Sequence, residues 1–383
     1  MDINLNFEPP MFFYHLSGGL TLFQGSNDLC WLGESHSNKL ILFSTLSGSP
    51  QDALKAYRGI RALARTRFEH AEDLKDPVSD NFALCETGKR TTECLAFRQM
   101  NFWDRASTGF LQQKKHDEYF MACRMATQIK KSVRRLEKLS VSYRTATSYY
   151  MPPKKRTRHL ELNKYSAHVG GEFASMLDDL YATRDALNAL VYRLVYKKSD
   201  GFTTKKFKPH VIDDVTPIGR AIFNAMFGPD ARKAIIARMS TYRAVSLHCL
   251  GSSNPVFGDC LTSVTRNGPL GPLTKLVFPL YDDIARLKQI ELGYSSGNIV
   301  PIPHDEAKRF MRARHEDALD FAYDCFIQIL RISELMSFRG DIPQKTTTIT
   351  EKDIVSATIT NADGTVTRLK RDPKTGTLKR LVS

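Results

Sequence analysis

The sequence contains no long hydrophobic run, and no apolar stretch approaches the ~18 residues that a membrane-spanning helix needs. Its first ten residues, MDINLNFEPP, are acidic and polar. They lack the basic start and the apolar stretch of a secretory signal peptide. We therefore expect no transmembrane segment and a cytoplasmic location.

Cysteines are few and scattered. There are seven of them, no two are spaced as CxxC, and none lies close in sequence to a pair of histidines. Zinc ribbons and zinc fingers require such spacings. We therefore predict reduced, mostly buried thiols, no metal site and no cofactor.

Several enzyme signatures are also missing. Gly88-Lys89 does not end a phosphate-binding loop, because the glycine required five residues before Gly88 is replaced by Ala83. The sequence has no GxGxxG, HExxH or GxSxG motif. Nucleotide hydrolysis, zincin proteolysis and α/β-hydrolase chemistry therefore have no support.

The composition is that of a folded protein, with 383 residues, 42% hydrophobic, 10% aromatic and 25% charged. The formal charge is +14, and it is concentrated in one place. Residues 121–170 hold 12 Lys and Arg against two Glu, a net +10. Such clustering favours a polyanionic partner, with nucleic acid first and acidic lipid second. The alternative is a solvated helix face followed by a basic loop.

The hydrophobic pattern changes along the chain and predicts four parts. Residues 1–48 form a β-rich segment, with short strands at 11–16, 20–23, 29–32 and 39–44 joined by Gly, Ser and Asn turns. Residues 49–116 form a helix over about 49–67 and an irregular connection. Residues 117–340 carry long helices at about 117–150, 172–198, 230–250 and 304–338, with an insertion at 251–303 that includes a helix near 281–292. Residues 341–383 form a β-meander tail with strands at 354–360, 365–369 and 377–382.

These parts predict a mainly α protein. The fold class that we expect is an antiparallel helical bundle with small β-meander appendages at the N- and C-termini. The helix that begins near residue 117 is amphipathic, with an apolar face and a cationic face. The candidate nucleic-acid-binding residues are the cations of this helix and of the loop that follows it: Arg124, Lys130, Lys131, Arg134, Arg135, Lys138, Lys154, Lys155, Arg156 and Arg158.

An Arg-x4-His sequence, Arg243 to His248, closes the third predicted helix, just before Gly251 and Pro255. Here the chain resembles the HEPN superfamily (higher eukaryotes and prokaryotes nucleotide-binding), whose helical bundle carries an Arg-x(4–6)-His motif. The resemblance covers 117–340. It implies metal-independent ribonuclease activity in a homodimer that brings two motifs together, commonly within bacterial toxin–antitoxin or antiviral defence systems. Ala244 departs from the family, which often has a small polar residue there.

The residue types suit that chemistry. Arg243 can stabilise the extra negative charge of a pentacoordinate phosphorane. His248 can take the proton of the ribose 2′-hydroxyl or protonate the leaving 5′-oxygen. Asp178 is the third candidate, as an acidic residue of the preceding helix that can orient the site; Asp179 and Asp185 lie on the same helix. The competing interpretation is a surface ion-pairing arginine and a helix-terminal histidine.

Two functions remain open from the sequence. The leading hypothesis is an endoribonuclease that acts through Arg243 and His248. The alternative is a non-catalytic nucleic-acid-binding or scaffold subunit with a partner protein in a defence complex. A peripheral membrane protein held by the cationic helix ranks last, because the apolar face of that helix is needed for a core.

Overall fold

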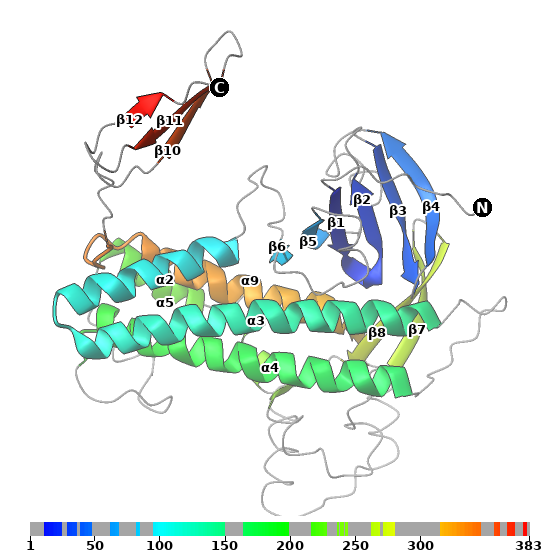
Figure 1. Ribbon diagram of the computed structural model, residues 1–383. Coiled ribbons are helices and arrows are strands. Elements are labelled where there is room, and N and C mark those ends of the chain that lie inside the picture. The colour runs from blue at the N-terminus through cyan, green and yellow to red at the C-terminus, as the bar shows by residue number, and fades with distance from the viewer. Residues whose placement is uncertain are drawn as a thin grey trace, which may run out of the picture. The chain divides into compact units, whose positions relative to one another are not determined.

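The computed structural model describes the residues that form the helices, strands and adjoining turns of the chain (Figure 1). They are 11–24, 29–36, 39–47, 62–68, 82–84, 95–149, 164–198, 216–227, 236, 238–240, 242–243, 262–268, 271–279, 315–345, 356–360, 366–371 and 378–380. The chain divides into two compact units, Met1–Pro343 and Gln344–Ser383. The described residues are mostly helical, with small antiparallel sheets. The prediction of a mainly α protein is confirmed at this level.

The N-terminal part of the first unit is a six-stranded antiparallel sheet. Its strands are β1 (Met11–Leu16), β2 (Thr21–Gln24), β3 (Leu29–His36), β4 (Lys39–Ser47), β5 (Ala62–Phe68) and β6 (Phe82–Leu84), in the order β4-β3-β2-β1-β5-β6. The first four strands form the predicted meander, which is confirmed. The helix predicted over 49–67 is wrong at its end, because residues 62–68 pair with β1 as strand β5. Its earlier residues lie outside the described part.

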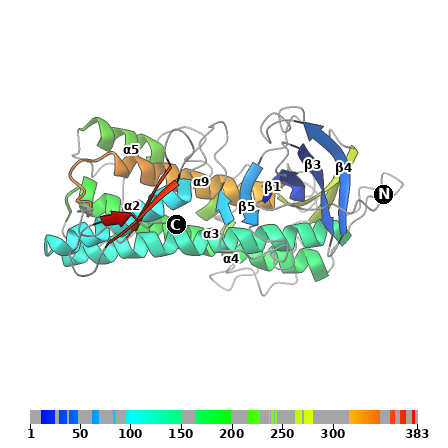
Figure 2. The ribbon, with the colours of Figure 1, turned by 45° about the horizontal axis from the view of Figure 1, so that its top comes forward.

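The helices of this unit whose two ends are both described are α2 (Leu95–Gln112), α3 (His116–Tyr149), α4 (Lys164–Leu190), α5 (Pro217–Phe227) and α9 (Ala318–Ser337). A π-helical turn, Val191–Val195, continues α4. Figure 2 shows α5 beside α9. The predicted helices at 117–150 and 172–198 correspond to α3 and to α4 with its π turn, whereas α2 was expected to be irregular. The described residues between 236 and 243 are helical, as predicted.

The last predicted helix begins later than its hydrophobic pattern suggests. Residues His315–Asp317 form strand β9, and α9 starts at Ala318. The Asp317 side chain is the N-cap, accepting a hydrogen bond from the Asp320 backbone N–H at 3.0 Å. An N-cap carboxylate supplies a partner for a helix-end N–H that has none within the helix. It therefore fixes where the helix begins.

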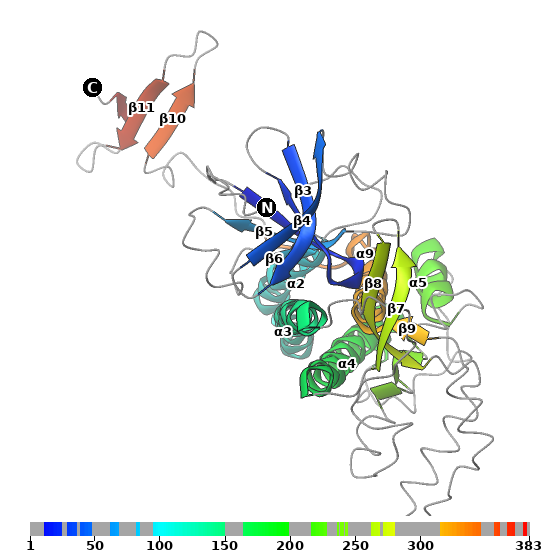
Figure 3. The same cartoon turned by 90° about the vertical axis from the view of Figure 1, so that its right-hand side faces the viewer.

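Strand β9 completes a second sheet (Figure 3). It pairs with β8 (Gly271–Pro279), which forms a hairpin with β7 (Thr262–Gly268). This hairpin lies in the predicted 251–303 insertion, and its residues Leu276 and Val277 are buried. The helix expected near 281–292 lies outside the described residues.

The core of the first unit is formed mainly by the facing sides of α2, α3, α4 and α9. Its largest fully buried side chains include Trp103, Phe110, Tyr143, Phe321 and Phe326. Burying aromatic rings removes large apolar areas from water, which is the main favourable term in folding. The inner face of α3 contributes Ala122, Met125, Ile129, Leu136 and Leu139 at helical spacing.

The end of α3 lies against the N-terminal sheet through polar and aromatic contacts. His15 Nδ1 and Ser140 Oγ are 3.0 Å apart, and the Arg144 guanidinium lies 4.6 Å from the ring centre of Phe13. Burial lowers the pKa of His15 well below its usual value, and the Arg144 charge lowers it further. Burial also lowers the pKa of Arg144 to about 9, against the opposing effect of the Glu137 charge. These side chains therefore attach the sheet to the helix.

The second unit is a three-stranded antiparallel sheet. Its strands are β10 (Ser356–Thr360), β11 (Val366–Arg371) and β12 (Leu378–Arg380), with β11 in the centre. The three predicted strands of the tail are each present. In the sequence, Asn-Ala-Asp-Gly and Asp-Pro-Lys-Thr-Gly stand between these strand segments, a composition typical of such a meander.

Candidate nucleic-acid interface and arginine site

Helix α3 carries a row of exposed cations on the side opposite its core residues. Arg124, Lys130, Lys131, Arg134 and Lys138 are all exposed. Neither Arg124 nor the three lysines form an ion pair within the described part of the chain. We call these five residues the outer cationic face.

Three of the five repeat every seven residues: Arg124, Lys131 and Lys138. Seven residues are close to two helical turns, so each of these side chains is rotated by only ~20° from the previous one. The rise of 1.5 Å per residue spaces them by about 10.5 Å along the axis. Within the outer cationic face, Arg124, Lys131 and Lys138 thus form a nearly straight row about 21 Å long.

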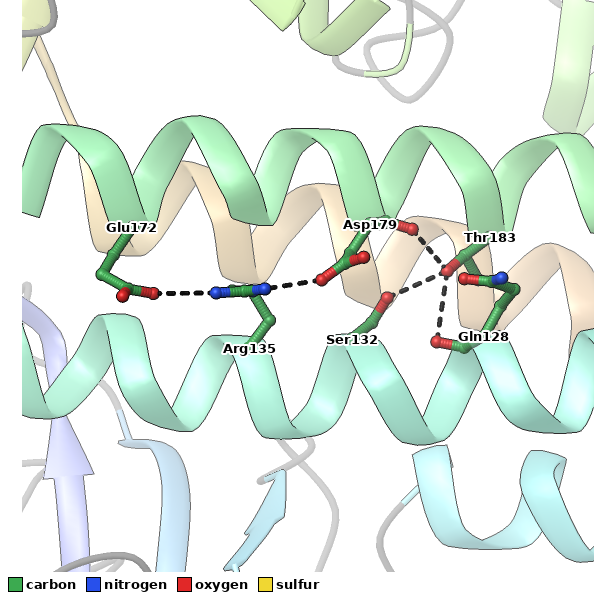
Figure 4. A network of polar contacts seen from close by, with 6 residues as sticks. All are labelled: Gln128, Ser132, Arg135, Glu172, Asp179 and Thr183. Carbon is green, nitrogen blue, oxygen red and sulfur yellow. Dashed lines mark hydrogen bonds and ion pairs between the residues drawn. The ribbon is translucent and has the colours of Figure 1, made fainter.

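Arg135 belongs to a different environment from the outer cationic face (Figure 4). Its Nε donates to Asp179 at 3.1 Å and its Nη1 to Glu172 at 3.2 Å, both on α4. Burial alone would lower the pKa of Arg135, but the hydrogen bonds and charges of Asp179 and Glu172 raise it. The guanidinium therefore fastens α3 to α4, although the sequence grouped Arg135 with the nucleic-acid-binding residues.

The same helix contact continues one turn away. Ser132 Oγ and Thr183 Oγ1 are 2.9 Å apart, and Thr183 also donates to the Asp179 carbonyl at 2.8 Å (Figure 4). Residues rising in number on α3 therefore meet falling numbers on α4, so the two helices are antiparallel. With one side of α3 held in this way, the outer cationic face is presented on a rigid element.

The predicted arginine site has a defined geometry at Arg243. Its Nε donates to Asp178 Oδ1 at 2.8 Å, and its guanidinium lies 4.5 Å from the ring centre of Tyr181. A second arginine, Arg184, lies 4.0 Å from the same ring centre. The structure therefore brings Asp178 to Arg243, and two guanidinium groups to one tyrosine.

Arg184 is itself tied to both elements. It donates to Ser240 Oγ, three residues before Arg243, and to Asp185 Oδ1 at 2.9 Å. Both arginines keep some solvent access, with side-chain exposures of 31% for Arg243 and 12% for Arg184. A guanidinium held by a carboxylate and an aromatic ring is pre-oriented, so it can meet a phosphate with little further loss of conformational freedom.

Sequence reasoning did not single out Tyr181 and Arg184. Their signal was available, because Asp178, Tyr181 and Arg184 recur every three residues and so lie near one face of α4. His248, the proposed acid or base, lies outside the described residues, as do Lys154, Lys155, Arg156 and Arg158.

Among the described residues, no group of three or more His, Cys, Asp and Glu side chains is arranged to hold a metal ion. No helix within the described ranges is both long enough and apolar enough to cross a membrane.

Comparisons with known proteins found no relative of this chain. No protein-family model, no curated protein and no solved structure matches the chain.

Proposed function

We propose that this protein binds RNA through the outer cationic face of α3. The observation that carries the proposal is the straight row of Arg124, Lys131 and Lys138, exposed and without carboxylate partners in the described part of the chain. Phosphate contacts supply most of the affinity of sequence-independent nucleic-acid binding. A rigid row of cations provides such contacts at a regular spacing.

The test is the salt dependence of binding. Each phosphate neutralised on a single strand contributes about 0.7 to the slope of log affinity against log salt concentration. The double variant Lys131→Gln/Lys138→Gln is expected to reduce that slope by about 1.4 and to weaken binding at low salt. Fluorescence anisotropy with a labelled oligoribonucleotide, measured from 50 to 200 mM salt, gives the slope.

Arg135→Gln is the matched control, because it removes a cation from the same helix that faces α4 rather than solvent. It is expected to lower the free energy of unfolding by about 1 kcal/mol and to leave the salt slope unchanged. If the double variant binds RNA with the wild-type slope, the outer cationic face is not the RNA-binding surface.

A second candidate function is metal-independent RNA cleavage of the HEPN type, and the contact between Arg243 and Asp178 favours it. In this reaction His248 takes the proton of the ribose 2′-hydroxyl, whose oxygen attacks the adjacent phosphorus. Arg243 stabilises the charge of the phosphorane, and an acid protonates the leaving 5′-oxygen. Asp178 keeps the Arg243 guanidinium in one orientation and does not itself transfer a proton.

Cleavage of RNA in the presence of EDTA tests this candidate. The variants Arg243→Gln and His248→Ala are each expected to abolish cleavage, and His248→Ala is expected to leave the salt slope of RNA binding intact. His168→Ala is the control, because His168 is an exposed histidine of α4 outside the arginine site. Wild-type protein that binds RNA without cutting it, or undiminished cleavage by His248→Ala, contradicts the assignment.

We further propose that the helices belong to an antiparallel bundle of the HEPN kind. The antiparallel contact of α3 with α4 and the helix that contains Arg243 support this arrangement. A homodimer would bring two Arg243 sites together, and a defence complex would supply the partner protein. Sedimentation of the wild-type chain at several concentrations tests the dimer.

A further inference from the structure

Helix α3 exposes one large apolar side chain, Phe120. Its exposed fraction is 66%, equal to that of Phe338 and above the 57% of Phe97. Leu111 on α2 is also exposed. Among the described residues of α3, Phe120 is the one large hydrophobic side chain that is exposed. A solvent-facing phenylalanine next to a row of cations calls for a specific explanation.

Phe120 lies at the N-terminal end of the outer cationic face. It is four residues before Arg124, about 6 Å along the helix axis and within about 40° around it. By the same geometry Phe120 and Lys138 are five helical turns apart on one line of the helix surface. The aromatic ring and the cations therefore form a single continuous row.

The first turn of α3 also carries two acidic residues, Asp117 and Glu118, and Asp117 lies seven residues before Arg124, on the same line of the helix. Arg193, on the π turn that follows α4, donates to Glu118 at 2.9 Å and lies 3.5 Å from Asp117. Burial alone would raise the pKa of Glu118, but a hydrogen bond from its own backbone, the hydrogen bond from Arg193 and the charges of Arg193 and Lys115 together lower it. Both carboxylates are thus paired with Arg193, which reduces their repulsion of an approaching phosphate.

We propose that the outer cationic face selects single-stranded over double-stranded RNA, with Phe120 stacking on an unpaired base. This inference rests on the proposed RNA-binding function. An aromatic side chain can reach the face of a base that is unpaired and splayed from its neighbours. It cannot reach the face of a base that is stacked inside a duplex. Proteins that bind single strands combine a cationic track for the backbone with aromatic rings for the bases, which is the combination found on α3.

The charge and spacing of the row favour RNA over an anionic membrane. A helix that lies in a membrane interface buries a broad apolar stripe along its length. Helix α3 already uses its apolar stripe in the core, and its outer side has one exposed aromatic ring followed by cations. One ring at the end of a cationic row fits one base beside several phosphates.

The experiment compares two probes of equal length, an unstructured oligoribonucleotide and a perfectly paired RNA duplex. Phe120→Ala is expected to weaken binding of the single strand by about tenfold and to leave duplex binding unchanged. Phe120→Trp is expected to restore single-strand binding, because a larger ring also stacks. Phe338→Ala removes an equally exposed ring from the end of α9 and is expected to change neither affinity.

Three results would overturn the inference. Phe120→Ala could bind both RNAs as Phe338→Ala does, or it could lose equal affinity for the single strand and the duplex. With vesicles containing anionic lipid as a third probe, Phe120→Ala could also lose affinity for the vesicles alone. The Lys131→Gln/Lys138→Gln variant separates this failure from failure of the proposed function. If that variant loses RNA affinity and Phe120→Ala does not, RNA binding stands and base stacking falls. If neither loses affinity, RNA binding by this surface falls as well.

Discussion

The hydroxyl of Tyr143 donates a hydrogen bond to the carboxylate of Asp317, which lies 174 residues later in the chain. The same oxygen accepts a hydrogen bond at 3.0 Å from the backbone N–H of Leu276. One buried hydroxyl therefore joins α3, strand β8 and the N-cap of α9. Burial and the charge of Asp317 raise the pKa of Tyr143 well above its usual value, which keeps this hydroxyl protonated as a donor.

Tyr143→Phe is expected to lower the free energy of unfolding by about 1–3 kcal/mol, because it leaves the buried Leu276 N–H without this acceptor and Asp317 without this donor. Urea denaturation followed by circular dichroism measures the change. Tyr181→Phe is the control, since it keeps the ring that lies near Arg243 and is expected to change stability by less than about 0.5 kcal/mol. Equal stabilities of the two variants would contradict the role of the Tyr143 hydroxyl.

Two helical glycines are expected to respond in opposite ways to alanine. A Cβ at Gly109 would lie 2.7 Å from the Pro343 carbonyl oxygen, whereas a Cβ at Gly171 would have nothing within 4 Å. Gly109→Ala should therefore destabilise the protein by about 1–3 kcal/mol through overpacking. Gly171→Ala should stabilise it by up to about 1 kcal/mol through helix propensity. Thermal unfolding of both variants checks the signs, and a stabilising Gly109→Ala would refute the close contact.

Stability is expected to fall as the pH drops below about 6.5, the ordinary histidine pKa. Burial and the Arg144 charge lower the pKa of His15 in the folded state. Below 6.5 the unfolded chain therefore binds a proton that the folded chain does not, which favours unfolding by up to about 1.4 kcal/mol per pH unit. Urea denaturation between pH 7.5 and 5.5 measures the slope, and His15→Asn should flatten it. His116 is exposed, and His116→Asn is expected to leave the slope of stability against pH unchanged. If His15→Asn also leaves the slope unchanged, His15 is not its source.

Ser333 links two side chains of α2 to α9. Its Oγ accepts from Trp103 Nε1 and donates to Gln99 Oε1, both at 2.7 Å. Ser333→Ala leaves both buried groups without this partner and is expected to cost about 1–3 kcal/mol in the free energy of unfolding. Ser337→Ala, one turn later and partly buried, is expected to cost about 0.5 kcal/mol or less. If Ser333→Ala is as stable as Ser337→Ala, the two hydrogen bonds of Ser333 contribute little to the free energy of unfolding.

The parts of the fold that could be predicted from the sequence are those whose signal is local. The first four N-terminal strands are short, mostly apolar runs bounded by Gly, Ser and Asn turn residues, so their positions follow from neighbours in the sequence. The start of α9 was placed too early, because its hydrophobic period continues backward past the Asp317 N-cap. Helix α2 was missed because its buried face includes the polar Gln99 and Ser107. Gln99 finds its partner in Ser333 of α9, which lies far away in the sequence.

The site shows the same division. Helical spacing places Arg135 only about 20° from Arg124, so a single helix cannot distinguish an exposed cation from one facing another helix. The carboxylates of Glu172 and Asp179 make that distinction, and they come from α4. Likewise the sequence offered three aspartates near the arginine motif, and the packing of α4 brings Asp178 to Arg243.

Helix α3 carries two interleaved sets of residues with separate duties. Substitution of an inner residue such as Met125 or Ile129 disturbs packing with the neighbouring helices, whereas substitution of Lys131 or Lys138 alters an exposed charge. Under the proposed function, single substitutions of these lysines would therefore change RNA affinity without changing the packing that holds α3 in place.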